Sequence, residues 1–194
     1  MNRILSKIQK RSLTFDFSKH IETRASPKTY DLDYLGYTND HRFGCTEPFP
    51  FLTTETVDYI KKLTQNEQFL SKTKYSMPFA PCVLRNPAQN DDFLKAIIES
   101  PEIEHHLSKI VGEEVAWHWN PWDASNINIS EKVETDELEA QVFDWHIDSQ
   151  PLTLVINISE FPDESKGEEK PQGGSTLIRR RNGEVLELPH PTVG

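Results

Sequence analysis

The spacing of hydrophobic residues changes at Gly112, and this change constrains the fold more than any other feature of the sequence. Before it, apolar side chains recur at the spacing of amphipathic helices, which predicts helices over residues 54–71, 90–99 and 101–112. Pro101 suits the first turn of the last helix and Gly112 suits its end, because proline fixes a helical φ and glycine accepts the left-handed cap. Residues 54–112 are therefore expected to be mainly helical.

After Gly112, apolar residues alternate with polar ones or form short runs, and both patterns are typical of β-strands. The expected strands cover residues 115–119, 126–129, 142–146, 152–158, 175–180 and 185–188. Asn182-Gly183 separates the last two and predicts a hairpin, because both residues accept the positive φ of a tight turn. Short strands at this spacing favour a sandwich or barrel. The expected fold class is α+β, mainly β with N-terminal helices.

The chain divides into three segments that differ in composition and in the spacing of their hydrophobic residues. Residues 1–52 are punctuated by prolines and glycines with tyrosines between them, which predicts an irregular N-terminal extension that lies over a folded body. Residues 53–112 form a helical support region, and residues 113–194 form the β-rich part. No internal repeat is visible.

Composition narrows the classes of partner and compartment. The net charge of −10 disfavours nucleic acid as a partner, since an acidic protein repels phosphate. No run of about 18 apolar residues occurs, so we expect no membrane span. Two cysteines without paired spacing indicate reduced thiols in an intracellular, cytoplasmic protein. The basic stretch of residues 1–11 also leaves a mitochondrial presequence open.

The sharpest local motif is His146-Ile147-Asp148. Residues two apart on a strand point to the same face, so this imidazole and this carboxylate can bind one divalent metal. With a distant second histidine they would form the 2-His-1-carboxylate facial triad of non-haem iron enzymes. His20-Ile21-Glu22 fits a related pattern but lies in a charged stretch without strand character, so we interpret it as accidental.

The context of this motif resembles a known family. The segments that carry the resemblance read D-W-H-I-D-S-Q-P, L-V-I-N-I-S and G-G-S-T-L, within residues 144–177. They are similar to the central core of iron(II)/2-oxoglutarate-dependent dioxygenases, in particular a group of fungal proteins with this domain, and the similarity spans residues 112–194. The resemblance implies a double-stranded β-helix, or jelly roll, with Fe(II) as cofactor and 2-oxoglutarate as co-substrate. It also implies oxidation, such as hydroxylation, of a small organic substrate.

The resemblance assigns roles to particular residues. His146 and Asp148 would be the first two iron ligands and the catalytic centre, with Trp145 and Phe143 packing beside them. Asn126, Asn128 and Thr176 are candidates for contact with the co-substrate.

This sequence departs from the family in the late strands. The family carries its third iron ligand there, followed by a basic residue that pairs with 2-oxoglutarate. Here we expect an incomplete jelly roll that stops before both. His190 is the remaining candidate third ligand, although it lies between two prolines. The Arg179–Arg181 run offers a substitute group for carboxylate binding, but we interpret it as an exposed strand end.

Three alternatives stay open. One is a catalytically inactive or fragmentary protein of the dioxygenase fold with a binding or regulatory role. Another is a metal enzyme of the cupin type, disfavoured because such proteins place a second histidine beside the one corresponding to His146. The third is a β-sandwich interaction module in which the His-x-Asp motif is accidental. The substrate and the oligomeric state are not predicted.

Overall fold

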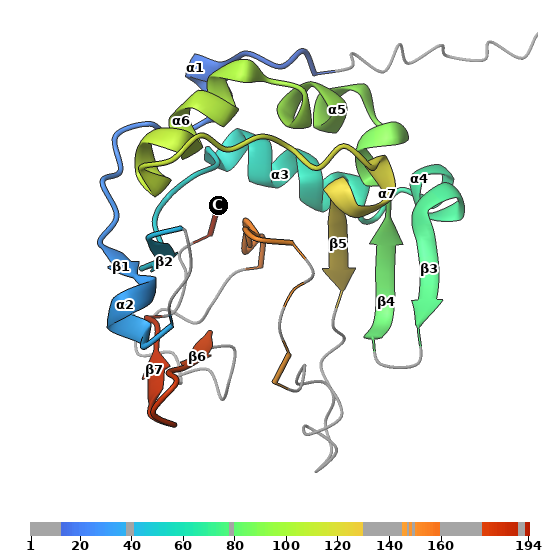
Figure 1. The fold of residues 1–194 in the computed structure, drawn as a ribbon. Coiled ribbons are helices and arrows are strands. Elements are labelled where there is room, and N and C mark those ends of the chain that lie inside the picture. The colour runs from blue at the N-terminus through green and yellow to red at the C-terminus, as the bar shows by residue number, and fades with distance from the viewer. Residues whose placement is uncertain are drawn as a thin grey trace, which may run out of the picture.

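The structure is a computed structural model that describes residues 13–37, 41–77, 80–129, 145–146, 148, 150–159, 176–189 and 193–194. Helices cover one side of a three-stranded sheet, and two smaller two-stranded sheets lie beside them (Figure 1). The helices are α1 (Phe17–His20), α2 (Leu32–Leu35), α3 (Thr54–Leu63), α4 (Glu67–Thr73), η1 (Pro87–Gln89), α5 (Asp92–Ile98), α6 (Pro101–Val111) and α7 (Pro121–Ala124). The strands are β1 (Thr29–Asp31), β2 (Phe43–Thr46), β3 (Lys74–Met77), β4 (Ala80–Arg85), β5 (Asn126–Ile129), β6 (Leu177–Arg179) and β7 (Val185–Glu187). This mixture confirms the α+β class, although within the described residues helices account for more of the chain than strands do.

Two of the three helices predicted before Gly112 are confirmed, and the third is divided into two. The helix expected over 54–71 is two helices, α3 and α4, because Asn66 interrupts it and caps α4 through a bond from the Phe69 amide (3.0 Å). The helix expected over 90–99 is α5, and its cap is Asp91, which accepts from the amides of Phe93 and Leu94. The predicted helix from Pro101 to Gly112 is confirmed: α6 ends at Gly112 with φ 79°.

The main sheet has the antiparallel order β3-β4-β5. Pro81 lies within β4, and this strand nevertheless pairs with both of its neighbours. Strand β4 keeps its register with β5, where Cys82 pairs with Ile129 and Leu84 with Ile127. These residues face the helices, so the sheet forms one wall of the core.

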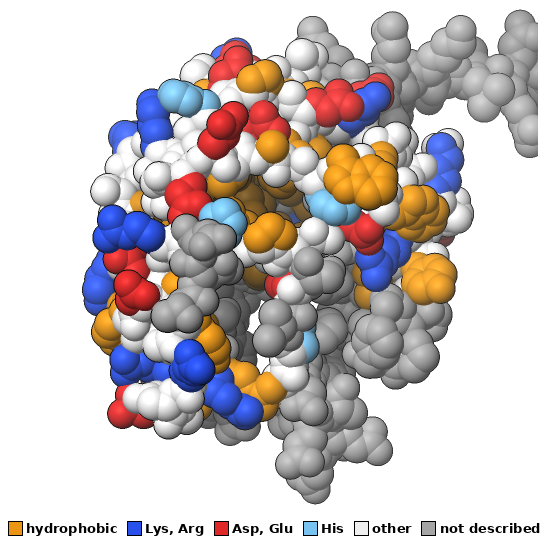
Figure 2. Space-filling view, viewed as in Figure 1, with side chains coloured by type: hydrophobic (Ala, Val, Ile, Leu, Met, Phe, Trp, Pro, Cys, Tyr) orange, Lys and Arg blue, Asp and Glu red, His pale blue; other side chains and the backbone are white. Residues whose placement is uncertain are grey.

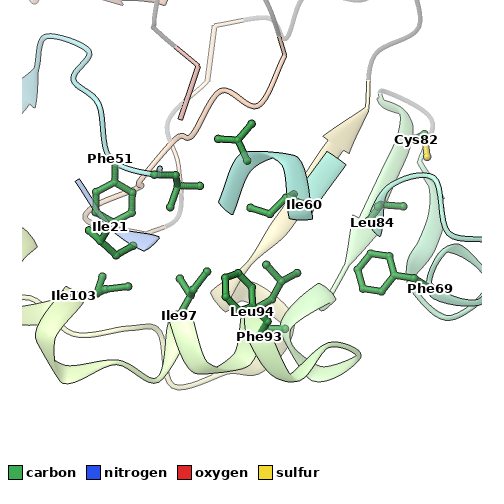
Figure 3. Packing of buried hydrophobic residues seen from close by; sticks show 13 residues of the cluster. Ile21, Phe51, Ile60, Phe69, Cys82, Leu84, Phe93, Leu94, Ile97 and Ile103 are labelled. Carbon is green, nitrogen blue, oxygen red and sulfur yellow. The ribbon is translucent and has the colours of Figure 1, made fainter. Parts of the chain in front are cut away.

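The core lies between the helices and this sheet (Figure 3). Its buried members are apolar and come from residues 21–103: Ile21, Phe51, Leu52, Val57, Ile60, Phe69, Cys82, Leu84, Ala88, Phe93, Leu94, Ile97 and Ile103. Removing this surface from water is the main stabilising contribution to the fold. Ile21, Phe51 and Leu52 belong to the N-terminal 52 residues, so that segment shares the core of the helices and does not simply cover it.

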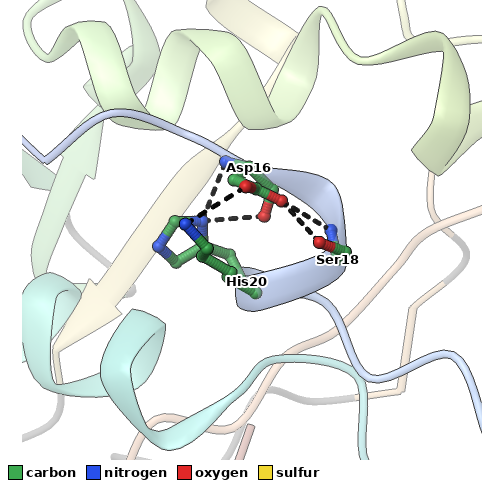
Figure 4. Close-up of polar contacts among 4 residues, drawn as sticks. Asp16, Ser18 and His20 are labelled. Atoms are coloured by element: carbon green, nitrogen blue, oxygen red, sulfur yellow. Dashed lines mark hydrogen bonds and ion pairs between the residues drawn. The ribbon is translucent and has the colours of Figure 1, made fainter.

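The segment predicted to be irregular also contains the short elements α1, β1, α2 and β2. Asp16 caps α1 by accepting from the Ser18 amide (Figure 4). Nδ1 of the buried His20 lies 2.9 Å from both the amide nitrogen and the carbonyl oxygen of Asp16, so its role as acceptor or donor depends on the tautomer. The His20 ring packs edge-on against Phe93 at 5.0 Å, which ties α1 to the core.

The β predictions have mixed outcomes. Strand β5 and the β6–β7 hairpin are confirmed, and Gly183 adopts φ 90° in the predicted turn. Residues 115–119 are not a strand: they cross over to α7. Residues 152–158 pair in no ladder within the described part of the chain, although Leu154, Ile156 and Ile158 still pack on the core. Residues 142–144 lie outside the described residues.

The β6–β7 hairpin docks on α2. Nε and Nη2 of Arg180 donate to the Tyr34 carbonyl at 3.1 and 2.7 Å, and the Arg181 amide donates to Leu35. The hydroxyl of Tyr37 donates to the Arg179 carbonyl at 2.9 Å. Arg180 belongs to the arginine run that we interpreted as an exposed strand end, but its side chain makes a tertiary contact with α2.

Within the described residues the strands form three separate sheets and no closed barrel. The jelly roll remains a prediction. None of the described helices has the length and hydrophobicity needed to cross a membrane.

Candidate metal site

The side chains of His146 and Asp148 lie side by side. Nε2 of His146 is 3.4 Å from Oδ1 of Asp148, and the two side chains are 59% and 49% exposed. The described backbone here is not a strand, so the proximity does not come from a regular ladder. The pair is accessible to a small ligand or ion from solvent.

A third side chain orients the carboxylate. Oγ1 of Thr153 donates a hydrogen bond of 2.8 Å to Oδ2 of Asp148. This bond occupies one carboxylate oxygen, while the other oxygen is the one near His146. A hydrogen bond to one oxygen of a carboxylate fixes the orientation of the group. It therefore also fixes the direction from which the other oxygen can bind a metal.

The separation of the two donor atoms fits a shared metal. Ligand atoms at about 2.1 Å from an ion and at right angles to each other lie about 3 Å apart. The observed 3.4 Å needs only a small side-chain adjustment. An imidazole nitrogen with a carboxylate oxygen is also a donor set that non-haem iron(II) accepts.

Two donors alone do not make a tight site. The part of the chain that the structure describes has no group of three or more His, Cys, Asp or Glu placed to hold a metal. The candidate third ligand, His190, lies outside the described residues.

The contacts of the predicted co-substrate residues are those of a strand and a hairpin. Asn126 and Asn128 are exposed on β5, on the face opposite Ile127 and the core. Oδ1 of Asn126 accepts from Nη1 of Arg85 at 3.0 Å. Thr176 precedes β6, where its carbonyl accepts from the Leu188 amide at 2.9 Å. These contacts are those of strand and hairpin residues, and they give none of the three a defined place at the metal pair.

Sequence reasoning missed one neighbour of the pair. The guanidinium carbon of Arg179 lies 4.1 Å from the ring centroid of Trp145, the residue before His146. Trp145 was interpreted as packing, but it is 45% exposed and carries this cation on its ring. Nothing in the spacing of the two residues signals the contact, because β6 is brought there by its docking on α2.

The remaining histidines of the described chain have other surroundings. His105 is exposed on α6, whereas the neighbouring His106 packs between Phe17 and Phe51. Burial, and to a smaller extent the charge of Lys109, lower the pKa of His106.

Comparison with known proteins identifies no relative. No protein-family model, no curated protein and no solved structure matches this chain.

Proposed function

We propose that the protein is a non-haem iron(II)- and 2-oxoglutarate-dependent oxygenase whose first two iron ligands are His146 and Asp148. The single observation that carries the proposal is the 3.4 Å approach of the imidazole Nε2 to a carboxylate oxygen whose partner oxygen is already bound to Thr153. Similarity of the surrounding motifs to that family supports the same assignment.

Each residue has a definable part in such a site. His146 would donate its neutral nitrogen, and Asp148 would offset one of the two positive charges of the metal. Thr153 would hold the carboxylate in its binding orientation. Iron bound there would supply the oxidising chemistry, with 2-oxoglutarate as the source of electrons, for oxidation of a small organic substrate.

Arg179 would bind an anionic group near His146 and Asp148. Its guanidinium presents several donors in a planar fork, which suits a carboxylate. Stacking on Trp145 positions this cation next to the residue that precedes His146. His190 remains the candidate third ligand of the proposal.

The first experiment adds iron(II) and 2-oxoglutarate to the full chain without oxygen and records the visible charge-transfer band. We expect a band that His146→Ala removes and that His105→Ala leaves unchanged, because His105 is an exposed histidine on α6. A band of equal intensity in His146→Ala would show that the ligand assignment is wrong. A folded wild-type chain without a band would instead favour the catalytically inactive alternative.

A second experiment tests the orienting role of Thr153. Thr153→Val keeps the shape of the side chain and removes the hydroxyl that donates to Asp148. We expect iron(II) affinity to fall about tenfold, the lower end of the range for lost outer-shell hydrogen bonds. Asp148→Ala should abolish tight binding, and unchanged affinity in that variant would refute the site.

A further inference from the structure

The turn of the β6–β7 hairpin carries Asn182-Gly183, a pair that the iron proposal does not use. The Gly183 amide donates to the Arg180 carbonyl at 2.9 Å and closes the turn between the two strands. Residues 181–185 are exposed, and Figure 2 shows basic and acidic side chains open to solvent at the end of the molecule where Figure 1 places β6 and β7. Water therefore reaches the turn.

Asparagine is a chemically labile residue, and the residue that follows it decides how labile it is. The reaction is an attack by the backbone nitrogen of the following residue on the side-chain amide carbon. Glycine has no Cβ to obstruct this approach, and its backbone rotates more freely than that of any other residue. Asn182-Gly183 is the single Asn-Gly pair in the chain, so the sequence singles out this position.

Other asparagines of the described chain have neighbours that hinder the same attack. Proline follows Asn86 and Asn120, and the proline nitrogen carries no hydrogen that it could lose. Isoleucine follows Asn126, Asn128 and Asn157, and its branched Cβ crowds the attacking nitrogen. Asn126 is exposed like Asn182, so it serves as an internal control for solvent access.

The side chain of Asn182 is held in a reactive arrangement. Its Oδ1 accepts a hydrogen bond of 3.0 Å from the Glu184 amide. This bond turns the side chain toward the peptide groups that follow it and draws electron density away from the amide carbon. The same donor would stabilise the negative charge that develops on Oδ1 during the attack, as the donors of an oxyanion hole do.

The attacking nitrogen becomes available when the turn opens. The hydrogen bond from the Gly183 amide to the Arg180 carbonyl must break first, because the nitrogen has to lose its proton. Strands β6 and β7 have three residues each, and so short a hairpin opens locally at a small cost in free energy. No atom lies within 4 Å of the position that a Cβ of Gly183 would take, so the glycine has room to rotate.

We propose that Asn182 is converted spontaneously to isoaspartate in the folded protein. The Gly183 nitrogen loses its proton to hydroxide and bonds to Cγ of Asn182, the Cγ–Nδ2 bond breaks, and the side-chain nitrogen leaves as ammonia. Water then opens the resulting cyclic imide at either carbonyl. Opening at the backbone carbonyl gives isoaspartate and predominates, because the adjacent backbone nitrogen withdraws electron density from that carbon. The net reaction consumes water, releases ammonia and involves no oxidation or reduction.

The product changes the hairpin and its contact with α2. In isoaspartate the backbone runs through the side-chain carbons, which lengthens the turn by one backbone atom. The longer turn no longer fits the bond between the Gly183 amide and the Arg180 carbonyl. Arg180 is also the residue that holds the hairpin on α2, through its bonds to the Tyr34 carbonyl. Conversion of Asn182 should therefore loosen the docking of the hairpin.

The test is incubation of the full chain at pH 8 and physiological temperature for several weeks, followed by pepsin digestion at acidic pH and mass spectrometry. Electron-transfer fragmentation distinguishes isoaspartate from aspartate. We expect Asn182 to convert at least about tenfold faster than Asn126 in the same sample, which requires a barrier lower by only about 1.4 kcal/mol. Conversion should be slower at pH 6, because proton loss precedes the attack. Equal conversion at both positions, or aspartate without isoaspartate, would overturn the proposal.

Variants of the glycine test the attack itself. Gly183→Ala puts a Cβ beside the attacking nitrogen and should slow conversion of Asn182 about tenfold. Gly183→Asn should slow it similarly, and asparagine tolerates the positive φ of this position better than alanine does. Unchanged conversion in both variants would contradict the mechanism. His146→Ala should convert at the wild-type rate, so this result is independent of the iron site.

Amide hydrogen exchange tests the consequence for the fold. In the converted chain, exchange should become faster in the β6–β7 hairpin and stay unchanged in α6. Asn182→Asp is the matched control, because it introduces a carboxylate without the extra backbone atom and should exchange like the fresh chain. Unchanged exchange in the converted chain, or equal acceleration in Asn182→Asp, would refute the role of the lengthened turn.

Discussion

His106 provides the sharpest test of the packing described above. Its ring stacks on Phe51 at 6.4 Å with 14° between planes and meets Phe17 edge-on at 6.3 Å. Nε2 is buried and has no hydrogen-bond partner among the described residues. The fold therefore buries a nitrogen without a hydrogen bond in an aromatic stack. A phenyl ring at this position would bury no polar atom.

Replacement of His106 by Phe should stabilise the protein. An unsatisfied buried nitrogen costs about 1 to 3 kcal/mol, and accommodating the slightly larger ring should offset part of the gain. We expect a net increase of about 1 kcal/mol in the free energy of unfolding at pH 8, which corresponds to about 3 °C in Tm.

The gain should grow at low pH. Burial first, and the charge of Lys109 second, lower the pKa of His106 in the folded protein. Between this lowered value and the unfolded value of about 6.5, the unfolded chain binds more protons than the folded one. Wild-type stability is therefore lost as pH falls from about 6.5 through the folded pKa, and the phenylalanine variant lacks this loss.

Urea unfolding at pH 8, 7, 6 and 5 measures both effects. His105→Phe is the matched control, because this neighbouring histidine is exposed and should show neither the gain nor its pH dependence. A His106→Phe variant that is less stable than wild type at every pH would refute the reasoning. A stability difference that stays constant between pH 8 and pH 5 would refute the part that concerns protonation.

Three further changes test the rest of the fold. Asp91→Ala removes the cap of α5 and the acceptor of the hydroxyl of Tyr59 in α3. The free energy of unfolding in denaturant should fall by about 2 kcal/mol, whereas the control Asp92→Ala should change it by less than about 0.5 kcal/mol. Arg180→Ala loses two hydrogen bonds to a carbonyl of α2, and amide hydrogen exchange should become faster in the β6–β7 hairpin while the α6 amides stay protected. Gly44→Ala would place a Cβ 2.8 Å from the backbone oxygen of Tyr30 in β1 and 2.8 Å from Cδ1 of Leu35 in α2, so a loss of about 2 kcal/mol in thermal unfolding is expected. An unchanged Tm would contradict the close packing of β2 on β1 and α2.

Local rules predicted the elements whose signals are contained in a few neighbouring residues. Pro101 and Gly112 marked the ends of α6, and Asn182-Gly183 marked the β6–β7 turn, because capping and turn conformations depend on the residue that adopts them.

Other features depended on contacts that no local pattern contains. Strand β4 forms despite Pro81 because β3 and β5 pair with it from both sides, and residues 152–158 have a strand-like sequence without a ladder partner in the described chain. The stacking of Arg179 on Trp145 follows from the docking of the β6–β7 hairpin on α2.

The sequence by itself thus determined the α+β class and the positions of the long helices, since these follow from backbone preference and periodicity. The tertiary structure alone decided which polar atoms are buried, including Nε2 of His106 and Nε1 of Trp117. Burial depends on what packs against a residue from distant parts of the chain, so two adjacent histidines such as His105 and His106 have the same sequence signal and opposite environments.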